Sequence, residues 1–132
     1  MKTIEIIQKS ENEYLIGMNK MNLTSNNTIH VTAIGEQTEE IATLTKQLHF
    51  NRFILVKGKV NYLIDVNRCG KNSPLARETW NELSKHDKTY KVAIFGLHPV
   101  AKVIASFVMG FYNKDNQKFF TTEEEAKAWL SV

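Results

Sequence analysis

Residues 62–77 read YLIDVNRCGKNSPLAR, and this stretch decides the fold. It opens with an apolar run that ends at Asp65, and such a run is typical of a strand buried on both faces of a sheet. Ser73 stands directly before Pro74. This pair favours a helix start, because proline fits the first helical position and serine accepts from the free N–H groups there. We therefore predict three elements: a strand over 60–66, a loop over 65–73 and a helix over 74–85.

The N-terminal part of the chain predicts antiparallel strands. Residues 3–8 and 14–18 flank a polar turn, which indicates a hairpin within residues 1–27. Residues 20–27 are rich in turn-forming residues, and residues 28–34 alternate apolar and polar side chains. Alternation of this kind fits an antiparallel sheet with one solvated face.

A helical spacing of apolar residues begins at Glu36. Residues 51–57 fit either the end of this helix or a short strand. Because Gly58 suits the position just after a helix, we expect a long helix that ends near Lys57.

The C-terminal part predicts two further strands, over 91–96 and 117–120, and two further helices, over 99–112 and up to Leu130. Thr121 with Glu124, or Thr122 with Glu125, supplies a capping box for the last helix. Antiparallel strands that lead into βαβ units predict a mixed sheet. The expected fold class is α/β, a single domain over residues 1–132 with antiparallel N-terminal strands, parallel inner strands and about four helices.

Composition favours one globular domain. The chain has 132 residues, of which 42% are hydrophobic and 23% charged, close to globular averages. Its net charge of +3 is spread along the chain, so we expect no specific nucleic-acid binding and at most a peripheral membrane contact. The single cysteine excludes an internal disulfide, and the first residues lack the apolar core of a signal peptide. We therefore expect a cytoplasmic protein.

Taken together, these motifs resemble the STAS/SEC14-like bacterial domains, relatives of the anti-sigma-factor antagonist fold. The resemblance covers about residues 28–130. It rests on the expected helix before Asp65 and on four short segments: Leu63-Ile64-Asp65, Ser73-Pro74-Leu75-Ala76-Arg77, KVAIFG over 91–96, and the closing run from Phe120 to Trp129-Leu130. The resemblance implies a non-enzymatic domain that acts by binding. In the antagonists, a partner kinase phosphorylates a serine at the start of this helix, and the phosphate controls binding to that partner.

Ser73 is the nearest match to that serine by position, so it is the candidate phosphoacceptor. The relatives carry an Asp-Ser motif close to the strand end, whereas here Ser73 is well separated from Asp65. The plain alternative for Ser73 is a helix N-cap. Four charged residues near the carboxyl end of the strand form a candidate anion or partner site: Asp65, Arg68, Lys71 and Arg77.

The segment 99–112 is apolar around nearly its whole circumference. A surface helix has a narrower apolar stripe, so this helix must be covered on both sides or leave one face for a partner. In the second case, the residues of a dimer contact or an apolar-ligand surface are Val103, Phe107, Met109 and Phe111.

The sequence contains no recognisable combination of catalytic residues. Arg68 and Lys71 would lower the pKa of the Cys69 thiol, but no histidine lies near it in the chain. The four histidines lack metal-ligand spacing, and phosphate-binding loops and nucleophile elbows are missing. We expect no metal, no cofactor and no catalytic residue.

Three functions follow from these observations. The first is a non-catalytic STAS-like interaction or regulatory module of a bacterial cell, with a protein partner or a second copy of itself. The alternative is a carrier or sensor of a small apolar or lipid-like ligand, as in SEC14-like domains. A small enzyme is the third and least supported.

Overall fold

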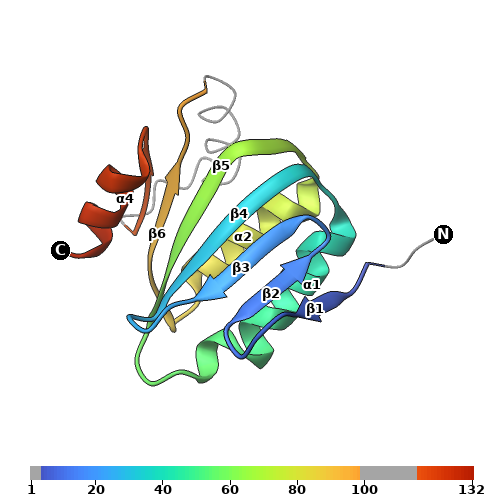
Figure 1. Cartoon of the computed structure of the whole chain (residues 1–132), viewed down its shortest axis with the longest axis horizontal. Coiled ribbons are helices and arrows are strands. Elements are labelled where there is room, and N and C mark those ends of the chain that lie inside the picture. Colours follow the sequence, from blue (N-terminus) through green and yellow to red (C-terminus); the bar gives the residue numbers. More distant parts are fainter. Residues whose placement is uncertain (1–3, 99–115) are drawn as a thin grey trace.

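One seven-stranded sheet organises the molecule, and its strands follow one another in space in the order of the chain (Figure 1). The computed structural model describes residues 4–98 and 116–132. The pairs from β1 to β4 are antiparallel, and those from β4 to β7 are parallel. The strands are β1 (Ile6–Gln8), β2 (Glu13–Ile16), β3 (Asn19–Leu23), β4 (Thr28–Gln37), β5 (Val60–Asn72), β6 (Thr89–Phe95) and β7 (Gln117–Phe120). The predicted mixed α/β sheet is confirmed.

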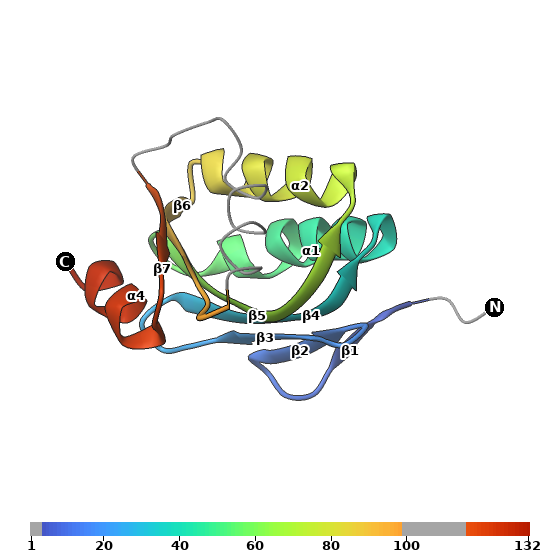
Figure 2. The ribbon, with the colours of Figure 1, turned by 90° about the horizontal axis from the view of Figure 1, so that it is seen from above.

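Three α-helices lie within the described residues: α1 (Glu39–Asn51), α2 (Pro74–Lys85) and α4 (Glu123–Leu130). Figure 2 shows α1 and α2 side by side over one face of the sheet, with α4 beside β6 and β7. The sequence predicted about four helices. The fourth, over 99–112, falls outside the described residues, together with its proposed contact residues Val103, Phe107, Met109 and Phe111.

Two apolar cores lie on opposite faces of the sheet, because successive side chains of a strand point to opposite sides. Tyr62 and Ile64 of β5 belong to the larger core, which also takes in Ile41 and Leu48 of α1. Leu63, between them, belongs to a smaller core with three other buried residues: Ala93, Phe95 and Ala126. Strand β5 is therefore buried on both faces near its start, as its apolar run predicts.

The largest difference from the sequence-based prediction is the length of β5. The predicted loop over 65–73 was wrong, because the strand continues to Asn72. Residues 51–57 form neither a helix end near Lys57 nor a strand. Helix α1 ends at Asn51, and a single 3-10 turn, η1 (Phe53–Leu55), buries Phe53 in the larger core. Strand β3 lies in a region expected to be mostly turn, and its residues alternate between buried and exposed.

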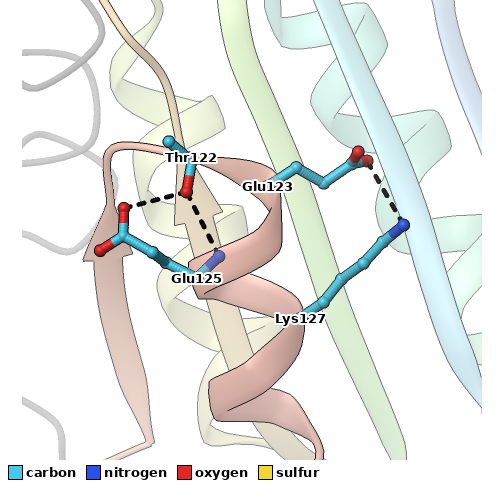
Figure 3. A network of polar contacts seen from close by, with 4 residues as sticks. All are labelled: Thr122, Glu123, Glu125 and Lys127. Carbon is cyan, nitrogen blue, oxygen red and sulfur yellow. Dashed lines mark hydrogen bonds and ion pairs between the residues drawn. The ribbon is translucent and has the colours of Figure 1, made fainter.

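The helix starts follow their expected capping residues. Ser73 caps α2, and Pro74 is its first residue. Of the two threonines considered as caps for the last helix, Thr122 is the observed N-cap, and it bonds to Glu125 (Figure 3). The Thr122 hydroxyl accepts from the Glu125 N–H at 3.3 Å and donates to the Glu125 carboxylate at 2.9 Å.

Candidate functional site

Helices α1 and α2 begin next to each other at one edge of the sheet. Strand β5 pairs with β6 only as far as Asp65, whereas its pairing with β4 continues to Gln37 opposite Asn72. The Ser73 N–H then donates to the Gln37 carbonyl oxygen at 2.9 Å. We call residues 37–41 and 72–76 the paired helix starts.

Each of the paired helix starts is capped by a hydroxyl side chain. Ser73 Oγ accepts from the Ala76 N–H at 3.1 Å, and Thr38 Oγ1 accepts from the Ile41 N–H at 3.3 Å. The first N–H groups of a helix lack partners within the helix and carry the positive end of its dipole. The start of α2 has no acidic residue in its first turn and favours a negative group on Ser73, whereas Glu39 and Glu40 occupy the first turn of α1.

Two irregularities in the pairing of β4 and β5 bring the strand ends together. The register shifts between Thr32 and Ile34 and again between Gly35 and Gln37. At the second shift the backbones come very close, since a Cβ on Gly70 would lie 3.1 Å from the carbonyl carbon of Gly35. A glycine in a strand often marks such a close approach. Gly70 therefore permits the geometry that seats Ser73 beside Gln37.

The structure divides the predicted anion site into two parts. Lys71, which is exposed, and the half-buried Arg77 flank Ser73 at the paired helix starts. Asp65 lies elsewhere, because the strand from Asp65 to Ser73 spans roughly 25 Å at about 3.3 Å per residue. Arg68 is exposed on β5 between them, opposite Ile34.

Asp65 has a local structural role. Its Oδ1 accepts from the Asn67 backbone N–H at 2.9 Å and from the Asn67 side-chain amide at 3.0 Å. Asn67 in turn accepts from the Leu97 N–H at 2.8 Å. These bonds hold the irregular part of β5 and tie it to the residues after β6.

A buried amide pair, which the sequence did not reveal, fixes the end of β4. Asn19 donates to the Gln37 side-chain oxygen at 2.7 Å, and Gln37 donates back at 3.2 Å. Both residues are buried, and Gln37 also donates to the Gly35 carbonyl at 3.0 Å. The adjoining cavity measures about 10 Å³, which is too small for an organic ligand. The paired helix starts therefore rest on a rigid base.

Cys69 is a poor nucleophile in this fold. The side chain is buried in the larger core, and its Sγ lies 3.6 Å from the Gly70 carbonyl oxygen. Burial raises the pKa of the thiol to about 11. The expectation that Arg68 and Lys71 would lower this pKa was wrong, because loss of water around the thiol outweighs their charge.

His49 is fully buried and bonded through Nδ1 to the Tyr62 hydroxyl, and its ring stacks on that tyrosine. Burial is the main cause that lowers the pKa of His49 to about 4, and His86 adds to the shift. Burial also raises the pKa of Tyr62 well above its usual value. Both side chains are therefore neutral at pH 7 and act as core residues. The sequence predicted burial for Tyr62 but not for His49.

Residues 4–98 and 116–132 hold no group of three or more His, Cys, Asp or Glu side chains placed to bind a metal. Within the same ranges, no helix is both long and apolar enough to cross a bilayer.

The fold defines the class of the protein as a mixed α/β domain whose long central strand leads directly into a helix capped by Ser73. The family model described as SpoIIAA-like matches residues 28–131. The chain belongs to the SpoIIAA-like family. The STAS-like part of the sequence resemblance is confirmed, and the SEC14-like part stays a prediction. A search of curated proteins finds no match.

Two solved structures share the fold. One is an uncharacterised protein of the DUF3478 family with a SpoIIAA-like fold from Shewanella loihica PV-4, with a TM-score of 0.61 and 20% identity over 85% of this chain and 91% of that one. The other is the anti-sigma factor antagonist SpoIIAA in its unphosphorylated form, with a TM-score of 0.53 and 12% identity over 86% of this chain and 97% of that one. At these identities the likeness concerns the fold alone.

Proposed function

We propose that this protein is a non-catalytic STAS-type interaction module whose partner-binding edge is the paired helix starts, with Ser73 as a phosphorylatable switch. The observation that carries the proposal is the position of Ser73 in a SpoIIAA-like fold. It follows the long central strand directly and caps the next helix. The solved structure of the antagonist SpoIIAA shows its unphosphorylated form, a description that distinguishes it from a phosphorylated form of that protein.

The local electrostatics support phosphate at this position. A phosphate on Ser73 adds between one and two negative charges at a helix N-terminus. There it lies at the free N–H groups of α2, close in sequence to the basic residues Lys71 and Arg77. The modification changes the charge of an exposed edge without disturbing the buried amide pair beneath it, so it can control a binding surface.

The non-catalytic part of the proposal rests on the two side chains most suited to chemistry. Burial keeps the Cys69 thiol protonated, and His49 is neutral and enclosed by aromatic rings. A carrier of apolar ligands was the alternative from the sequence. It depended on the segment 99–112, and the described residues lend it no support.

Photo-crosslinking tests the partner-binding edge. A photoreactive residue replaces Lys71 in the full chain, expressed in the cells that naturally produce it. The matched control carries the same residue at Lys20, which is exposed on β3. We expect a defined protein crosslinked from position 71 and not from position 20. Identical crosslinks from both positions would contradict the proposed edge.

Mass spectrometry of the same purified chain tests the switch. We expect phosphate on Ser73 in the wild type, no phosphate in Ser73→Ala, and an unchanged level in Thr122→Ala, which removes the cap of a different helix. Ser73→Asp should alter the yield of the crosslink from position 71. If phosphate never occurs on Ser73 and Ser73→Asp changes no crosslink, the switch is disproved while the binding edge can still stand.

A further inference from the structure

A groove runs along the outward surface between α1 and α2, which lie side by side on the same face of the sheet (Figure 2). It has a volume of about 600 Å³, with Thr43 on the α1 side and Leu75 on the α2 side. A second depression of about 340 Å³ is also lined by Thr43 and Leu75. The two depressions therefore adjoin each other at Thr43 and Leu75, and we refer to them together as the groove between α1 and α2; its smaller part lies next to the paired helix starts.

Apolar side chains form part of the groove surface. Ile4, Leu44 and Leu75 line the smaller depression, and the first two pack against the larger core from outside. All three are only partly buried. The groove therefore offers apolar contact area near Leu75 to a partner side chain.

The lining of the groove is acidic in a chain that is basic overall. Four glutamates line it, Glu39, Glu40, Glu78 and Glu82, against two lysines, Lys46 and Lys85. Four negative and two positive charges leave a net charge of −2 on the groove, whereas the whole chain carries +3. Negative charge is thus concentrated on this surface.

The internal ion pair does not neutralise this charge. Lys46 Nζ lies 2.9 Å from Glu82 Oε2, and this ion pair joins α1 to α2 across the groove. Glu78 lies one turn before Glu82 and has no ion-pair partner among residues 4–98 and 116–132. Two glutamates four positions apart on a helix repel one another, so a cationic group of a bound partner beside Glu78 would relieve this repulsion.

We infer that the groove between α1 and α2 binds an amphipathic helix of a partner protein, with apolar residues on one side and Lys or Arg on the other. Two adjacent helices present ridges and grooves that a third helix fills at about 8–10 Å between axes. The distance along α2 from Leu75 to Lys85 is roughly 15 Å, enough for about three turns of a partner helix. The negative lining repels nucleic acid and anionic membranes, which leaves a basic protein segment as the occupant.

This inference rests on the proposed function as an interaction module and names the chemistry of the partner. The probe is a fluorescently labelled synthetic helix of leucine and lysine, with the leucines on one face. Fluorescence anisotropy measures its binding to the full wild-type chain. One comparison peptide has the same composition with scrambled order, and a second replaces every lysine with glutamate. We expect binding of the first peptide, weaker binding of the scrambled one and none of the acidic one.

Variants locate the binding on the protein. The double variant Glu39→Gln/Glu78→Gln should weaken binding about tenfold, because two charges that face the peptide are lost. Thr43→Trp places a large side chain at the junction of the two depressions and should also weaken it. The matched control Glu124→Gln removes an exposed charge from α4 and should leave the affinity unchanged.

Three results would overturn the inference. The first is equal binding of the ordered and scrambled peptides. The second is an equal loss of peptide affinity in the α4 control and in the groove variants. The third is a dimer, observed by sedimentation, that Glu39→Gln/Glu78→Gln converts to monomers. The last result would make a second copy of the chain the occupant. If crosslinks from position 71 persist while the peptide fails to bind, the groove inference falls and the proposed binding edge stands. If the peptide binds but no crosslinks form from position 71, the groove inference stands and the proposed binding edge falls.

Discussion

The backbone N–H of Ser73 lies 2.9 Å from the carbonyl oxygen of Gln37 and donates to it. This bond joins the start of α2 to the end of β4, and the neighbouring Gln37 side chain is held by Asn19 in the interior. A displacement of Ser73 therefore requires movement of a buried amide pair. The proposed switch residue thus sits on a fixed base, so we expect its modification to change surface charge more than fold.

The close approach of Gly70 to Gly35 predicts that Gly70→Ala destabilises the fold. The new Cβ would lie 3.1–3.3 Å from backbone atoms of Gly35 and Glu36, which cannot rotate away as a side chain can. We expect a loss of about 1–3 kcal/mol in the free energy of unfolding, measured by urea denaturation. Lys71→Ala, at the exposed neighbouring position, should change it by less than about 0.5 kcal/mol. Equal stability of Gly70→Ala and the wild type would contradict the close approach.

The capping bond of Ser73 makes a second prediction about stability. Ser73→Ala removes the acceptor for the Ala76 N–H and should cost about 1 kcal/mol. Ser73→Asp keeps an acceptor at the N-cap and adds favourable charge, so its stability should equal or exceed that of the wild type. Urea denaturation of the three chains measures both effects. A Ser73→Asp variant as unstable as Ser73→Ala would show that the side chain at this position does not cap α2.

Much of the architecture could be predicted from the sequence because its signals are local. The Ser73-Pro74 pair predicted the start of α2 correctly, and the end expected near Lys85 is also observed. The apolar run from Tyr62 gave the central buried strand. Capping chemistry acts within one turn of helix, so it stays visible without knowledge of the rest of the fold.

The site was harder to predict because it depends on contacts between distant residues. The stretch from Asn67 to Asn72 has the composition of a loop, yet it pairs with β4 as a strand. Asn19 looks like a turn residue, but it is buried because it bonds to Gln37 across the sheet. Pairing with a neighbouring strand overrides local propensity, and the sequence of one strand does not reveal its neighbour.

The burial of Cys69 predicts a slow reaction of its thiol in the folded protein. With a pKa of about 11, the thiolate is scarce at pH 8, and the surrounding core restricts access. An aromatic disulfide reagent should react roughly 100-fold or more slowly with the native chain than with the chain in denaturant. Absorbance of the released thiolate measures both rates. Comparable rates in the two states would contradict the buried position of the thiol.

The buried pair of His49 and Tyr62 predicts a loss of stability in acid. The pKa of His49 falls from 6.5 to about 4 on folding, so the unfolded chain binds a proton at this residue in a range where the folded chain does not. The stability that the fold gains from keeping His49 neutral is fully present above pH 6.5 and is lost as the pH falls toward 4. A pKa shift of this size corresponds to about 3 kcal/mol in the free energy of unfolding. Burial lowers the pKa of His30 as well, which adds a change in the same direction.

A comparison with His49→Gln isolates this contribution. The glutamine amide can still accept from the Tyr62 hydroxyl but does not titrate, so we expect the variant to lose about 3 kcal/mol less than the wild type between pH 7 and pH 4. The variant should be less stable than the wild type at pH 7, because it gives up the ring contacts of His49 with Phe50 and His86. Urea denaturation at a series of pH values measures both quantities. If the two chains lose stability in parallel as the pH falls, His49 is not the group that titrates in this range.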